Sequence, residues 1–160
     1  MSTNQQKKPK KIQDLLIAVA FFAVVGLIAY GIAWLLHSDP VPGDITVYSG
    51  ETEVVMLQNV IAEEHKKNGN TQYDRFVIEE DAEKFPVVEM HKSIMLEASQ
   101  DPISDMFYTV YNEDFTERYY RAVRFEYPEE AGTYYVVIDT MWGNEDLKFT
   151  TQHGFTLIIE

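Results

Sequence analysis

The sequence predicts an all-β domain, built as an antiparallel β-sandwich and preceded by one N-terminal transmembrane helix. An apolar run covers residues 15–36 and contains no charged residue. After it, short runs of β-branched and aromatic residues alternate with Gly, Pro, Asn and Asp, which is the pattern of strands joined by turns. Seven or eight such strands within residues 45–160 are typical of two antiparallel sheets packed face to face.

The apolar run LLIAVAFFAVVGLIAYGIAWLL is long enough to cross a bilayer as a helix. At 1.5 Å per residue it spans roughly 33 Å, against a hydrocarbon core of about 30 Å. Four lysines precede it within residues 1–14, and Asp39 and Asp44 follow it. The positive-inside rule therefore predicts a cytoplasmic basic segment at residues 1–14 and an extracellular C-terminal domain.

A cleaved signal peptide is the alternative interpretation of the same run. The run exceeds the apolar region of about 7–15 residues that signal peptides usually carry, and no clean small-x-small cleavage site follows it. We therefore expect an uncleaved signal-anchor that makes the protein a single-pass protein of the cell membrane.

Residues 37–44 contain two prolines and one glycine and predict a short extended tether between the membrane and the domain. A first strand is expected over residues 45–49, ended by Gly50. The segment 53–67 is ambiguous, because its apolar spacing suits either a strand or a helix closed by lysines and Gly69.

Beyond the turn formed by residues 68–70, further strands are expected at regular intervals. In the strand that ends at Trp142, alternation places Tyr134 and every second residue up to Trp142 on one face. We therefore expect Trp142 in the core. The further strands are expected at residues 73–78, 85–90, 93–98, 106–111, 119–127, 134–142 and 155–159.

The C-terminal third contains PEEAGTYYVVIDTMW over residues 128–142 and HGFTLII over residues 153–159. This pair resembles the last hairpin of small extracellular immunoglobulin-like domains of Gram-positive bacterial membrane proteins and lipoproteins. In those domains a G-x-Y-x-apolar…W strand leads into a final strand of the form F-x-apolar-x-apolar. The similarity covers roughly the last 70 residues, judged by strand and turn signatures. It implies an immunoglobulin-like β-sandwich outside a bacterial cell, and no reaction.

The chain is acidic, with a formal net charge of −13. Residues 1–14 contribute +3 to that total, so residues 15–160 carry −16. Such a domain repels nucleic-acid phosphates, anionic lipid headgroups and wall polyanions, and no nucleic-acid partner is expected. The absence of Cys excludes disulfides, thiolate zinc sites and iron–sulfur clusters.

No catalytic residue, cofactor or metal site is predicted. The sequence has no Gly-x-Ser-x-Gly elbow and no Gly-rich phosphate loop. His65, His91 and His153 lie far apart, without the spacing of zinc ligands. Three acidic clusters lack the register of a calcium loop and are interpreted as solvated loops, with a weak cation site as the alternative. These clusters are residues 79–83, 112–114 and 144–146.

Three arginines, Arg118, Arg121 and Arg124, fall within seven residues. In a strand, alternation places Arg118, Tyr120 and Arg124 outward. The same alternation places Arg121 and Val123 inward. Because Arg and Tyr are enriched in binding hot spots, the outward set is the candidate binding surface. The alternative is that these arginines pair with the carboxylates of the same domain.

These observations predict a membrane-anchored extracellular binding or accessory module that is not an enzyme and has a protein partner at the cell surface. One alternative is a surface hydrolase or metal-dependent enzyme whose site the sequence does not reveal. Another is a structural subunit of a membrane complex, in which the helix assembles with another membrane protein.

Overall fold

A computed structural model describes residues 10–36, 39–91 and 93–160. The chain divides into two units, one ending at Asp39 and one covering Pro40–Glu160, and each is described by itself. Most of the predicted cytoplasmic segment and residues 37–38 of the predicted tether lie outside the described residues.

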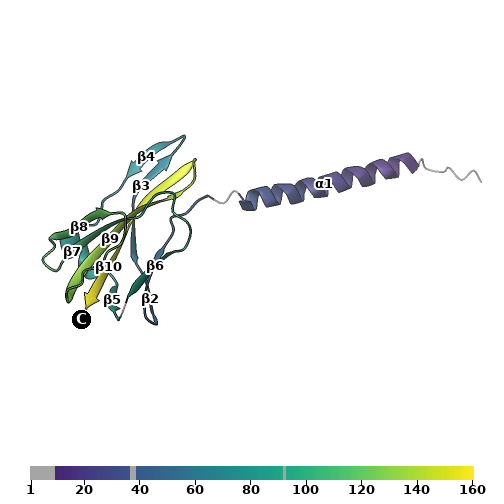
Figure 1. Cartoon of the computed structure of the whole chain (residues 1–160). Coiled ribbons are helices and arrows are strands. Elements are labelled where there is room, and N and C mark those ends of the chain that lie inside the picture. Colours follow the sequence, from purple (N-terminus) through teal and green to yellow (C-terminus); the bar gives the residue numbers. More distant parts are fainter. Residues whose placement is uncertain (1–9, 37–38, 92) are drawn as a thin grey trace, which may run out of the picture. The chain divides into compact units, whose positions relative to one another are not determined.

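Among its described residues, the first unit contains one helix, α1, over Lys10–Leu36 (Figure 1). Its stretch Leu15–Ala33 is long and apolar enough to cross a membrane, and a signal sequence meets the same criteria. No residue of the stretch is buried inside the protein; Phe22 and Tyr30, for example, are each 72% exposed. A helix that is apolar all round and leaves its side chains exposed is suited to lipid rather than to water.

The second unit is a β domain of two sheets (Figure 1). The three-stranded sheet, called sheet A, has the order β2-β1-β6, and all its pairs are antiparallel. Gly50 makes the turn from β1 to β2 with φ +61°, a conformation that favours glycine. The strands are β1 (Ile45–Ser49), β2 (Thr52–Val55) and β6 (Ile94–Ala98).

The larger sheet, called sheet B, has the order β4-β3-β10-β9-β7-β8 and is curled into a half-barrel. Strand β10 is its centre, because it pairs with β9 on one side and with both β3 and β5 on the other. The β5–β10 pair is parallel, so the predicted antiparallel arrangement is right for every other pair. The strands are β3 (Leu57–His65), β4 (Gly69–Gln72), β5 (Val87–Met90), β7 (Phe107–Asn112), β8 (Glu117–Ala122), β9 (Gly132–Gly143) and β10 (Leu147–Ile159).

The ambiguous segment 53–67 consists of strands β2 and β3, not of a helix. The prediction of a strand over residues 73–78 is wrong. There Tyr73 still donates a backbone hydrogen bond to Ile61 of β3, but the chain then leaves the sheet. It forms a short helix, α2 (Ile78–Asp81), followed by a 3-10 turn, η1 (Ala82–Lys84). Asp81, the last residue of this helix, reaches back to its start, where its carboxylate accepts a hydrogen bond from the backbone N–H of Val77 at 2.8 Å.

The main core lies between sheet A and one face of sheet B. Ile45 and Val47 of sheet A are fully buried, as are Trp142 and Phe155 of sheet B. The predicted core position of Trp142 is therefore confirmed. The polar group of its ring is satisfied, since the indole Nε1–H donates a hydrogen bond to Thr151 Oγ1 at 2.7 Å.

A second, smaller core covers part of the opposite face of sheet B, which we call the outer face. Here α2 and η1 place Ile78, Ala82 and Phe85 on Val137 of β9. Phe85 is 4% exposed and lies directly on Gly154 of β10, where a side chain would occupy the space of the ring. The glycine thus lets an aromatic ring cover the sheet backbone.

Gly154→Ala is therefore expected to destabilise the β domain by about 1–3 kcal/mol, the usual cost of overpacking a core. A Cβ at position 154 would lie 2.4 Å from Cζ of Phe85, so the ring and the α2 segment must shift. Urea denaturation of the single variants and of Gly154→Ala/Phe85→Leu would test this. The smaller residue at position 85 should recover part of the loss, and strictly additive effects would contradict the contact.

The β domain begins before β1. Gln100 Nε2 donates a hydrogen bond to the carbonyl of Val41 at 2.7 Å, and Gln58 Nε2 donates to that of Gly43 at 2.7 Å. Residues 41–44 of the predicted tether are therefore attached to the domain.

Candidate functional site

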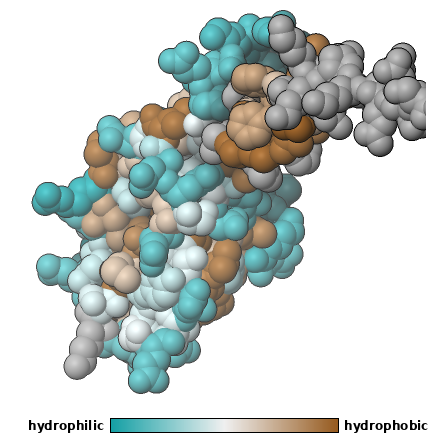
Figure 2. All heavy atoms as spheres, turned by 90° about the vertical axis from the view of Figure 1, so that its right-hand side faces the viewer, coloured by the Kyte–Doolittle hydropathy of each residue, from teal (hydrophilic) through white to brown (hydrophobic). Residues whose placement is uncertain are grey.

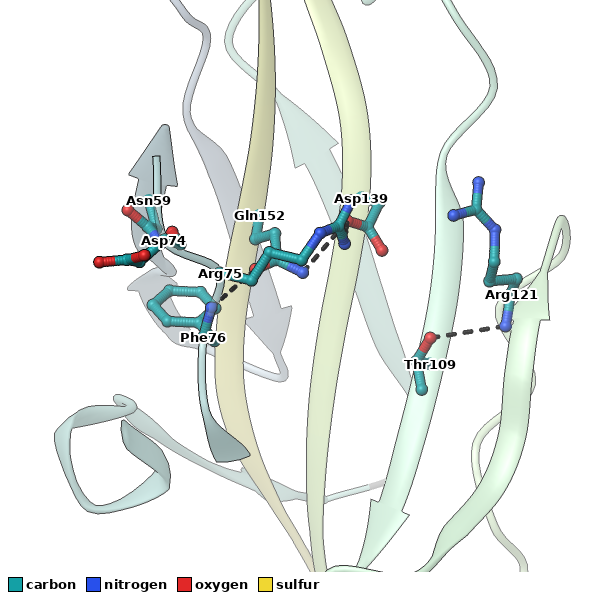
Figure 3. A network of polar contacts seen from close by, with 8 residues as sticks. All are labelled: Asn59, Asp74, Arg75, Phe76, Thr109, Arg121, Asp139 and Gln152. Atoms are coloured by element: carbon teal, nitrogen blue, oxygen red, sulfur yellow. Dashed lines mark hydrogen bonds and ion pairs between the residues drawn. The ribbon is translucent and has the colours of Figure 1, made fainter. Parts of the chain in front are cut away.

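The outer face of sheet B carries a polar network beside the second core (Figure 3). Asp139 of β9 and Gln152 of β10 are partners in the strand register. Asp139 Oδ1 accepts hydrogen bonds from Gln152 Nε2 at 3.1 Å and from Arg75 Nη1 at 3.2 Å. Gln152 Oε1 accepts the backbone N–H of Phe76 at 2.8 Å. The network therefore fixes the extended segment before α2 to the centre of the sheet.

Asp139 is a buried carboxylate on a central strand, with 9% of its surface exposed. A charge in such a position is unfavourable unless it is paired and hydrogen-bonded. Arg75 supplies the charge and Gln152 supplies a second donor. The side chain of Arg75 remains 58% exposed, so the ion pair opens to solvent on the arginine side.

Arg121 of β8 approaches the same face from the other side of β7. Its guanidinium carbon lies 4.7 Å from the centre of the Phe107 ring, a cation–π arrangement. Its backbone N–H donates to Thr109 Oγ1 at 3.4 Å, and its φ is +47°. The left-handed conformation is costly for a residue with a long side chain, and such residues cluster at functional sites. Among the described residues, no carboxylate forms an ion pair with Arg121.

A cavity of about 140 Å³ lies between these groups. Two guanidinium groups, those of Arg75 and Arg121, line it together with the single carboxylate of Asp139. The cavity is smaller than the roughly 300–1,000 Å³ of sites that enclose a whole drug-sized ligand, so it suits one small functional group. Its other lining residues are Ser104, Phe107, Thr140, Met141 and Thr150.

The predicted binding surface of Arg118, Tyr120 and Arg124 does not form one strand face. β8 ends at Ala122, and the left-handed Arg121 interrupts the alternation. Tyr120 is 67% exposed and Arg124 is exposed beyond the end of the strand. The inward orientation predicted for Arg121 and Val123 is wrong, since Arg121 is exposed and Val123 is 62% exposed.

Arg118 is engaged within the molecule. Its Nη1 donates to Glu130 Oε2 at 3.1 Å, and its guanidinium carbon lies within 5.9 Å of the ring centres of Tyr119 and Tyr134. The hydrogen bond that Arg118 donates to the Glu130 carboxylate raises the pKa of Arg118. For this arginine, the structure agrees with the alternative of pairing inside the domain.

The acidic clusters serve local turns. The backbone and hydroxyl of Thr116 both donate to Asp114 Oδ1, and these bonds lower the pKa of Asp114. Asn144 Oδ1 accepts the backbone N–H of Asp146 and of Leu147. Within residues 10–36, 39–91 and 93–160, no group of three or more His, Asp or Glu side chains is placed to hold a metal ion.

The distribution of exposed apolar residues favours a polar binding site over an apolar one. Figure 2 shows hydrophobic groups of the β domain separated by hydrophilic and neutral ones on the face that it draws. The exposed apolar residues come from separate elements, with Val55 on β2, Met95 on β6 and Tyr120 on β8. Scattered apolar residues are normal on a soluble surface, so the polar cavity is the more distinctive feature.

No family model, curated protein or solved structure matches this chain. The cavity offers the guanidinium of Arg121, which has no ion-pair partner in the part of the chain that the structure describes, the guanidinium of Arg75 paired with a buried carboxylate, and an aromatic wall. Such a set can hold a small anionic group through charge-assisted hydrogen bonds.

Proposed function

We propose that this protein is a membrane-anchored, non-enzymatic binding or accessory module at the cell surface. The observation that carries the proposal is Arg121, which lines the cavity and has an unfavourable backbone conformation. Its guanidinium has no ion-pair partner among the described residues. A fold keeps such strain where the surrounding structure enforces it, and binding sites are the usual places. The cavity on the outer face of sheet B is the proposed binding site.

The anchor and its orientation belong to the same proposal. The exposed apolar surface of α1 supports insertion into a membrane, and the lysines before it support a cytoplasmic N-terminus. We also propose that the two sheets form an immunoglobulin-like sandwich of the kind found outside Gram-positive bacteria. Their shared core around Trp142 and Phe155 supports this relation.

Photo-crosslinking of the full anchored chain in its own membrane tests the binding function. A photo-reactive amino acid replaces Met141, which lines the cavity, or Met95, which is 59% exposed on sheet A, away from the cavity. We expect a defined adduct from position 141 and none of the same mass from position 95. Identical adducts from both positions, or none from position 141, would contradict a binding site on the outer face.

The orientation gives a separate prediction. Protease added to intact cells should remove the part of the chain beyond about residue 37 and spare an epitope tag at the N-terminus, because lysines are retained on the cytoplasmic side. The fragments can be followed by immunoblotting with and without membrane disruption. A C-terminal domain protected in intact cells would refute the orientation, and a mature chain starting near Trp34 would establish cleavage.

A further inference from the structure

We propose that the cavity between Arg75 and Arg121 binds a single carboxylate group that carries a short apolar substituent. This inference rests on the proposed binding function and names the chemical class of the ligand. Two sources share this chemistry, the C-terminal carboxylate of a peptide and a free small carboxylic acid.

The balance of charge around the cavity favours a monoanion. Its lining contains two guanidinium groups and one carboxylate, and Arg75 already shares its charge with Asp139. One positive charge, that of Arg121, remains without an ion-pair partner in the part of the chain that the structure describes. A ligand with one negative charge compensates it. A polyanion would extend over a domain of strongly negative net charge and be repelled.

The guanidinium of Arg121 suits a carboxylate. Its carbon lies 4.7 Å from the centre of the Phe107 ring, and among the described residues no carboxylate forms an ion pair with its N–H edge. Two parallel N–H bonds from such an edge match the two oxygens of a carboxylate. Figure 3 shows the Arg121 guanidinium level with Asp139 along the strands, although the two residues belong to β8 and β9.

The rest of the lining determines what can accompany the carboxylate. Phe107 and Met141 provide apolar walls, and Thr150 provides a hydroxyl. Ser104 is less available, because its Oγ already accepts the N–H of Met141 at 3.1 Å and donates to the carbonyl of Asp105 at 3.0 Å. A volume of about 140 Å³ admits a carboxylate with a few carbon atoms, so the remainder of a larger ligand would lie outside the cavity.

The experiment is an NMR titration of the full chain in lipid nanodiscs, read on the arginine Nε–H resonances. The sequence contains only four arginines, so each resonance can be assigned by substitution. The probes are butyrate, butyramide, inorganic phosphate, and N-acetyl-Ala-Leu with either a free or an amidated C-terminus. We expect the Arg121 resonance to shift with butyrate or with the free peptide, and not with either amide.

Arg121→Gln should weaken carboxylate binding at least tenfold. Arg124→Gln is the matched control, because it removes the same charge from a nearby exposed position that does not line the cavity, and it should change affinity less than twofold. Backbone resonances of each variant establish that it is folded. Equal loss in both variants, binding of the amides, or tighter binding of phosphate would overturn the proposal.

Comparison of butyrate with the free peptide distinguishes the two sources of the carboxylate. Binding of the free peptide at least tenfold tighter than butyrate identifies a peptide C-terminus, and equal affinities identify a free acid; both support the ligand class. If position 141 crosslinks a partner but no carboxylate binds, the ligand class is wrong and the binding function stands. If neither occurs, both proposals fall.

Discussion

Replacing Trp142 with alanine is expected to lower the free energy of unfolding of the β domain by about 3–5 kcal/mol. The side chain is fully buried between the two sheets, and its indole N–H donates to Thr151. The surrounding atoms are close: a Cβ at Gly43 would lie 2.6 Å from Cζ3 of the indole. Removal of the ring would leave a large cavity that a sheet on either side prevents from collapsing, and Thr151 would lose its donor.

Urea denaturation followed by circular dichroism measures this loss without relying on tryptophan fluorescence. Trp142→Phe is the matched control, since it retains most of the buried area and loses the N–H donor, so its cost should be clearly smaller. A loss well under 1 kcal/mol for Trp142→Ala would show that the ring is not part of the core.

Acid is expected to destabilise the domain through His153 by about 3 kcal/mol between pH 6.5 and about pH 4. His153 is fully buried, and burial lowers the pKa of its imidazole to about 4. The ring contacts Thr151 Oγ1 through Nε2 at 2.9 Å, while Nδ1 has no hydrogen-bond partner among the described residues. Among the described residues, Nδ1 therefore has no acceptor that would stabilise the charged, doubly protonated ring.

The sign follows from the two states of the protein. Between pH 6.5 and about 4 the unfolded chain binds a proton at His153 and the folded chain does not. The contribution of neutral His153 to the free energy of unfolding is therefore fully present above pH 6.5. Below that pH it falls by about 1.4 kcal/mol per pH unit, until the imidazole of the folded protein is itself protonated.

The measurement is the free energy of unfolding from pH 4 to pH 7.5 for the unmodified protein and for His153→Gln. Carboxylates titrate in both proteins, so the difference between the two curves isolates the histidine. His91→Gln, at an exposed position, is the matched control. Parallel curves for the unmodified protein and His153→Gln would contradict the prediction.

Strand β9 was predictable because it pairs regularly with a neighbouring strand on each side. β9 pairs without interruption with β10 and with β7, so every second residue keeps the same orientation. Trp142 is buried for this reason, and a period of two is sufficient to find it.

Alternation failed where the backbone departs from extended geometry. At Arg121 the positive φ turns the chain, and the β7–β8 register shifts at two points. Residues 73–78 show a β-like composition, but the N–H of Phe76 bonds to a side chain, Gln152, instead of a neighbouring strand. Composition alone does not reveal such partners.

The candidate site was largely hidden for the same reason. Asp139 is the one charged residue of the mostly apolar β9, which is a signal of a buried polar site. Its partner Arg75 lies 64 positions earlier in a segment that does not join the sheet. Only the tertiary fold brings it together with Arg121.

The central position of β10 also affects when the domain can assemble. β3 pairs Leu57 with Gly154 and His65 with Leu147, and β5 pairs with the last residues of β10. During synthesis these strands emerge early and lack their partner until residues 147–159 follow. Contacts of such long sequence separation form late. Sheet B therefore stays incomplete until β10 has been synthesised, and β3 and β5 keep unpaired edges until then.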